Sequence, residues 1–86
     1  MMQTFEIEHE IRTYLVNNFL AGREEKLRDS VPLLGNVIDS TGVLEFVMFL
    51  QDRFAIIVED QEVTTDNLDS VINAVAFVKR KLGDAS

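Results

Sequence analysis

The hydrophobic positions of this chain recur with the period of an α-helix in three separate stretches. The first stretch runs from about Phe5 to Leu20, where apolar residues repeat at spacings of three and four, which predicts an amphipathic helix. Thr4 is a suitable N-cap for this helix, and Gly22 is a suitable residue to end it. Its predicted apolar face consists of Ile7, Ile11, Tyr14, Leu15 and Phe19.

The pattern is clearest in the second helix, which is expected from Ser40 to about Phe54 with Asp39 as its N-cap. Its continuous apolar stripe consists of Val43, Phe46, Val47, Leu50 and Phe54. The third helix is expected from about Ser70 to Leu82, and Gly83 suits the position after its end. Its predicted buried face consists of Val71, Ile72, Val75, Val78 and Leu82.

A long connection, residues 22–39, joins the first two of these helices. It begins with the charged run Arg23–Asp29, which is compatible with a helical turn, and continues through Pro32 and Gly35, which break regular structure. Its apolar residues predict that it packs on the core, and they are Val31, Leu33, Leu34, Val37 and Ile38.

The second connection follows Phe54, where Ile56–Val58 would suit a strand by propensity. No second strand is available to pair with this segment, so we expect an extended connection, followed by a short helical turn at Thr65–Leu68 with Thr64 or Thr65 as its cap. The predicted fold is therefore all-α. We expect a single domain, residues 1–86, in which three main helices and one short helix form a small four-helix bundle.

Composition narrows the possible functions. The chain has no Cys and a single His, which argues against disulfides, a thiolate metal site or a zinc site, and we expect His9 to be an exposed helix residue. The N-terminus lacks the arginine-rich character of a transit peptide, and no apolar run reaches the roughly 18 residues that span a bilayer. We therefore expect a cytoplasmic protein that does not bind a membrane or a metal.

Negative charge is concentrated in the middle of the chain, whose net charge is −7. Between Asp29 and Val78, nine acidic residues stand against the single base Arg53, which gives −8 for that stretch. Such a field repels nucleic acid and attracts basic protein surfaces. The acids are Asp29, Asp39, Glu45, Asp52, Glu59, Asp60, Glu62, Asp66 and Asp69.

The dipeptide Asp-Ser occurs three times, and its usual meaning is helix capping. Ser30 precedes Val31 and Pro32, which indicates a loop or an extended turn. Ser70 opens the last helix and is explained as a cap. Ser40 opens the central helix after the long connection and lies within the acidic stretch.

Helical projection places Ser40, Leu44 and Met48 along one edge of the second helix, outside its apolar stripe. With the neighbouring acids, this arrangement is typical of a docking surface around a modifiable serine. The alternative is a helix with a wide core face, in which the two apolar residues would be buried. The residues predicted to bind partners are Leu44, Glu45, Met48, Asp52 and Glu59.

The run GNVIDSTGVLE, residues 35–45, resembles the phosphopantetheine attachment site of acyl and peptidyl carrier proteins. In that family an Asp-Ser pair opens the second of four helices, which matches Asp39 and Ser40 here. Residues 54–58 resemble the family's helix-to-loop segment, and residues 66–71 its short third helix and entry to the fourth. Many fatty-acid carriers have Leu after the modified Ser, where this chain has Thr41 and Gly42, so it resembles more closely a discrete carrier of a dedicated pathway.

This resemblance implies a protein that is not an enzyme and that carries acyl or aminoacyl groups as thioesters on a 4'-phosphopantetheine arm attached to Ser40. The implied partners are a phosphopantetheinyl transferase that uses coenzyme A, a loading ligase, and downstream acyl-transferring enzymes of fatty-acid or secondary-metabolite biosynthesis. These partners would present basic surfaces to a monomeric carrier. Phe46, Phe54 and Phe19 are expected to fill the space beneath the second helix, leaving little room for a long acyl chain.

Two functions from different classes stay open at this point. The rival to the carrier is a small acidic helical protein-interaction domain without a prosthetic group. A calcium-binding helix-loop-helix is disfavoured, because Thr65 stands where its loop requires glycine and the loop lacks a final Glu.

Overall fold

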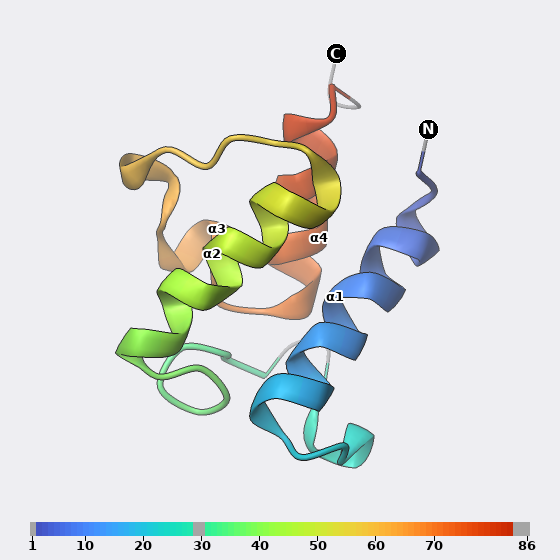
Figure 1. Ribbon diagram of the computed structural model, residues 1–86, viewed down its shortest axis with the longest axis vertical. Helices are drawn as coiled ribbons and strands as arrows, with labels where there is room; N and C mark the ends of the chain where they lie inside the picture. Colours follow the sequence, from blue (N-terminus) through green and yellow to red (C-terminus); the bar gives the residue numbers. More distant parts are fainter. Residues whose placement is uncertain (1, 29–30, 84–86) are drawn as a thin grey trace.

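The computed structural model describes residues 2–28 and 31–83. Within these ranges the chain forms helices and no strand, with three main α-helices and one short one (Figure 1), as the hydrophobic pattern predicts. Asp29 and Ser30 lie outside these ranges, and so do the predictions made for them. The elements are α1 (Thr4–Phe19), η1 (Glu24–Lys26), α2 (Ser40–Phe54), η2 (Asp60–Glu62), α3 (Thr65–Leu68) and α4 (Val71–Lys81), where η marks a single turn of 3-10 helix.

Side-chain caps explain where three of the helices begin. The side chains of Asp39, Thr64 and Ser70 each accept a hydrogen bond from the backbone N–H three residues later, at 2.7, 3.3 and 3.0 Å. Helix α1 begins at Thr4, one residue earlier than predicted. Gln3 is its N-cap, and the N–H of Gln3 donates to a carboxylate oxygen of Glu6 at 2.8 Å.

The apolar faces of the helices meet in one core. The predicted core faces of α1 and α2 are confirmed, although four of their residues are only half-buried, namely Tyr14, Phe19, Val43 and Val47. The prediction for α4 is wrong at Ile72, whose side chain is 55% exposed. Ala74 and Phe77 occupy the core instead, and Ile72 points away from them around the helix. The largest fully buried side chains are Ile7, Ile11, Leu15, Leu33, Ile38, Phe46, Leu50, Leu68, Val71, Phe77 and Val78.

The long connection between α1 and α2 packs on the core, as its apolar residues predict. Leu27, Leu33 and Ile38 are buried, and the guanidinium of Arg12 on α1 donates to the carbonyl oxygen of Leu27 at 2.6 Å. The other apolar residues of this connection are half-buried, and they are Val31, Leu34 and Val37.

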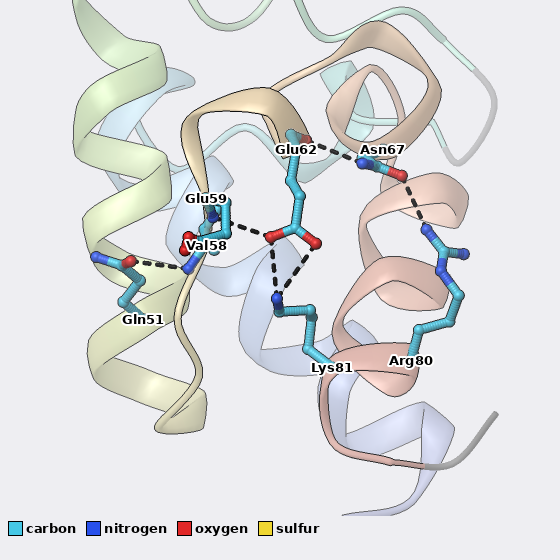
Figure 2. Close-up of polar contacts among 7 residues, drawn as sticks. All are labelled: Gln51, Val58, Glu59, Glu62, Asn67, Arg80 and Lys81. Carbon is cyan, nitrogen blue, oxygen red and sulfur yellow. Dashed lines mark hydrogen bonds and ion pairs between the residues drawn. The ribbon is translucent and has the colours of Figure 1, made fainter. Parts of the chain in front are cut away.

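Side chains from two helices hold the connection between α2 and α3 in place (Figure 2). On one side, the N–H of Val58 donates to Oε1 of Gln51 on α2 at 2.9 Å. On the other, the Glu62 carboxylate accepts hydrogen bonds from the N–H of Glu59 at 2.9 Å and from the Lys81 ammonium of α4 at 2.9 and 3.2 Å. This segment is extended up to η2, and its position between α2 and α4 is set by these contacts.

Acid is expected to weaken the contacts of Glu62. The hydrogen bond from the Glu59 N–H, and then that from Lys81, lower the pKa of Glu62 from its ordinary value of 4.5. A carboxylate with a lowered folded-state pKa stabilises the fold above its unfolded pKa, and this contribution is lost as the pH falls through the folded pKa. Below pH 4.5, the free energy of unfolding should therefore fall more steeply for the wild type than for Glu62→Gln.

Urea unfolding at a series of pH values measures this difference directly. Glu10, whose pKa is lowered by its hydrogen bond with Arg53, titrates in both proteins and cancels in the comparison. Parallel acid profiles for the wild type and Glu62→Gln would show that the Glu62 contacts contribute nothing.

Candidate functional site

Ser40 is the first residue of α2, and its side chain is exposed. Asp39 precedes it in an extended conformation and binds the N–H of Gly42 through its carboxylate at 2.7 Å. This cap fixes the direction in which the chain enters the helix, and therefore where the Ser40 hydroxyl lies. The start of α2 lies at the end of the molecule away from both chain termini (Figure 1).

The backbone before Ser40 folds into a compact loop. The carbonyl oxygen of Leu33 accepts hydrogen bonds from the N–H groups of Asn36, Val37 and Ile38, at 3.2, 2.8 and 2.8 Å. The N–H of Gly35 donates to the carbonyl oxygen of Ile38 at 2.8 Å. Gly35 has a φ of 89°, a left-handed conformation in which a side chain is strained, so the glycine is required for this turn.

Asp69, which lies between α3 and α4, anchors this loop through two hydrogen bonds. Its carbonyl oxygen accepts the N–H of Leu33 at 2.6 Å, and its carboxylate accepts the N–H of Leu34 at 2.9 Å. From the sequence, the Asp-Ser pair at 69–70 was expected only to cap a helix, so this role of Asp69 was not predicted. The two partners are 35 residues apart, so no local pattern could have revealed the contact.

At Gly42, the first turn of α2 lies against the end of α1. A Cβ atom placed on Gly42 would lie 2.6 Å from Cε1 of Phe19 and 3.1 Å from Cγ2 of Ile38, closer than side chains pack. Glycine is therefore the residue that lets the first turn of α2 rest on the Phe19 ring. This contact connects the position of Ser40 to the C-terminal end of α1.

The outer face of α2 carries an apolar strip bordered by acids. Leu44 and Met48 are 67% and 61% exposed, so the alternative in which both belong to a wide core face is wrong. Glu45 and Asp52 are also exposed on α2. Glu59 is exposed too, but it lies on the connection that Gln51 holds beside α2 (Figure 2) rather than on the helix.

The structure adds Ile57 to the exposed apolar residues near α2. Its side chain is 70% exposed, whereas its neighbours Ile56 and Val58 are buried. This alternation is that of an extended segment with one face on the core. The expected extended conformation could have identified Ile57 as the outward residue, although its exposure was not predicted.

A cluster of aromatic rings lies beneath α2. Phe46 and Phe54 are buried as predicted, whereas Phe19 is half-buried. Tyr14 and Phe49, which were not predicted for this role, stack at 4.1 Å between ring centroids. Tyr14 also stacks at 6.0 Å with Phe46 and meets Phe19 edge-on at 5.9 Å. Burial, and then the negative charge of Glu45, raise the pKa of Tyr14.

The part of the chain that the structure describes contains no cluster suited to a metal ion and no helix suited to span a membrane. His9 is exposed on α1, and within residues 2–28 and 31–83 no three acidic or histidine side chains are grouped so that they could hold a metal ion. None of the helices in these ranges has the length and apolar character needed to cross a membrane. The start of α2 is therefore the candidate functional site.

Comparison with known proteins assigns no family to this chain. No protein-family model matches the sequence, and no curated protein is significantly similar to it.

Proposed function

We propose that this chain is a carrier protein that holds acyl or aminoacyl groups as thioesters on a 4'-phosphopantetheine arm attached to Ser40. The observation that supports this most directly is the exposed Ser40 hydroxyl at the first position of α2. That serine lies in the run, residues 35–45, that resembles the attachment site of carrier proteins.

The residues at the start of α2 fit a phosphodiester on Ser40. The first N–H groups of a helix have no partners within the helix, and together with the helix dipole they favour an anion. The carboxylate of the preceding residue, Asp39, accepts the N–H of Gly42 and so is directed toward the helix. The arm supplies a thiol that forms a thioester with the cargo.

The chain's own contribution is to present the serine. The loop anchored by Asp69 and the Asp39 cap hold the Ser40 hydroxyl at the surface. No histidine adjoins Ser40 in the sequence, so a separate transferase would supply the base that activates this hydroxyl. The aromatic rings packed beneath α2 favour a cargo that stays outside the core.

The outer face of α2 suits partners with basic surfaces that also carry apolar residues. The exposed acids Glu45 and Asp52 would attract such a surface from a distance, and Leu44 and Met48 would then be covered. Charge-guided contacts of this kind form quickly, and they need not be tight. A carrier that must release its cargo to successive enzymes needs these properties.

Intact mass spectrometry tests the proposal. Incubation of the full chain with coenzyme A, Mg²⁺ and a broad-specificity phosphopantetheinyl transferase should add about 340 Da, the mass of the arm as a covalent modification. Peptide fragmentation should place the added mass on Ser40. An unchanged mass, under conditions in which a known carrier is fully modified, would instead favour the acidic interaction domain without a prosthetic group.

A charge reversal on the outer face of α2 should slow recognition without unfolding the protein. We expect Glu45→Lys to lower kcat/KM for arm attachment on the order of tenfold, because electrostatic attraction raises association rates by such factors. The melting temperature should barely change, since surface substitutions usually cost less than about 0.5 kcal/mol. Met48→Ala should also slow attachment with little loss of stability.

Asp66→Lys is the matched control, because Asp66 is an exposed acid on α3 and the substitution makes the same change in charge. An equal loss of kcat/KM in Asp66→Lys and Glu45→Lys would mean that only net charge matters. That result would remove the specific role of α2 in recognition.

A further inference from the structure

Asp69 occupies the corner of the fold where α3 ends and α4 begins. The residue before it, Leu68, is fully buried, and the residue after it, Ser70, is buried and caps α4. The N–H of Asp69 also donates to the carbonyl oxygen of Thr65 at 3.1 Å. Because both of its neighbours are packed into the core, Asp69 is a rigid point to which a loop can be attached.

The loop that precedes Ser40 is attached to this corner through two adjacent residues. Leu33 donates its N–H to the carbonyl oxygen of Asp69, and its own carbonyl oxygen accepts three N–H groups of the loop. Leu34 donates its N–H to the Asp69 carboxylate, and it forms an isolated β-bridge with Ile38, two residues before Ser40. Asp69 therefore holds the two residues around which the loop is built.

Only one of these two contacts depends on the Asp69 side chain. Any residue at this position has a carbonyl oxygen for Leu33, whereas the N–H of Leu34 needs a side-chain acceptor of the right length. This hydrogen bond is partly buried, so its loss would leave the Leu34 N–H without a partner where water has limited access. Asparagine would place an oxygen at the same distance from the backbone, and glutamate would place its oxygens one methylene further away.

We propose that Asp69 is a positioning residue for the attachment of the arm to Ser40. Its carboxylate holds Leu34, and through Leu34 the loop, in the conformation that the transferase recognises. The position of the acceptor oxygen is what matters in this role, and the negative charge is not required. This inference rests on the proposed carrier function, and it adds to the outer face of α2 a second determinant of recognition, 29 residues after Ser40 in the sequence.

Steady-state kinetics of arm attachment to the full chain test this role. In Asp69→Ala, KM for the carrier should rise roughly tenfold while kcat barely changes, because only the fraction of molecules with an ordered loop can bind the transferase. Asp69→Asn should keep the wild-type KM because it keeps the acceptor oxygen. Asp69→Glu should behave like Asp69→Ala, although it keeps the charge. Asp66→Ala, the matched control, removes an exposed acid of α3 and should leave both constants unchanged.

Amide hydrogen exchange followed by NMR tests the anchor without the transferase. The N–H of Leu34 should exchange at least about tenfold faster in Asp69→Ala than in the wild type or in Asp69→Asn, because its acceptor is gone. Circular dichroism should show that the variants are folded. If Asp69→Ala were too unstable to measure, the contrast between Asp69→Asn and Asp69→Glu would decide the question.

Two results would overturn the inference. One is a wild-type KM in folded Asp69→Ala, even where the exchange of the Leu34 N–H is faster. The other is a raised KM in Asp69→Asn together with a wild-type KM in Asp69→Glu, which would show that the charge is recognised and the position of the oxygen is not. A wild-type protein that gains no arm is a different result, because it would refute the proposed function itself, and the inference would fall with it.

Discussion

Ser40→Ala is expected to abolish completely the gain of about 340 Da on incubation with coenzyme A and a phosphopantetheinyl transferase. The substitution removes the hydroxyl to which the arm would be attached. It leaves the Asp39 cap and the Leu33 loop in place, because neither depends on the Ser40 side chain. The variant should therefore unfold at a temperature close to that of the wild type, which separates loss of the site from loss of the fold.

Ser70→Ala is the control for Ser40→Ala. Ser70 is buried and caps α4 through the N–H of Asn73, so its loss should cost about 1 kcal/mol of stability. At a temperature where this variant is folded, it should still gain the mass of the arm. A Ser40→Ala protein that still gains this mass would refute Ser40 as the attachment site.

Phe46→Ala should produce the largest loss of stability that we predict. The Phe46 side chain is fully buried in the middle of α2 and stacks with Tyr14. Removing a buried phenylalanine costs about 3–5 kcal/mol. A domain of this length has a total free energy of unfolding on the order of 4–13 kcal/mol, so this single change approaches the limit of folding.

Urea denaturation followed by circular dichroism measures this loss. Leu44→Ala is the matched control, because it shortens an apolar side chain on the same helix at a position that is 67% exposed. It should cost less than about 0.5 kcal/mol. A loss below about 1 kcal/mol for Phe46→Ala would mean that the rings beneath α2 are loosely packed, and it would weaken the argument that cargo stays outside the core.

Local signals in the sequence were sufficient to place the helices. The bounds of α2 and α3 agree with the prediction because Asp39 and Thr64 cap them through the N–H three residues later. The face of α4 was harder to predict. Val71 and Val78 lie on its buried side, but Ile72 fits the same spacing and lies outside it. Periodicity alone could not show that α4 buries the side bearing Phe77, since that depends on the position of its neighbours.

In the candidate site, too, the features set by local sequence were predicted and those set by distant segments were not. The positions of Ser40, Leu44 and Met48 on the surface of α2 follow from helical geometry and were predicted. The roles of Asp69 and Gly42 were missed, because each depends on a partner in a distant segment of the chain.

The anchoring of the Ser40 loop by Asp69 has a consequence for the order of events during protein synthesis. Asp69 follows the serine by 29 residues, so the serine emerges from the ribosome before the anchor does. The loop can reach its final shape only after Asp69 has also left the ribosome. An enzyme that recognises this shape would accordingly pass over a growing chain in which the serine is accessible and Asp69 is still enclosed.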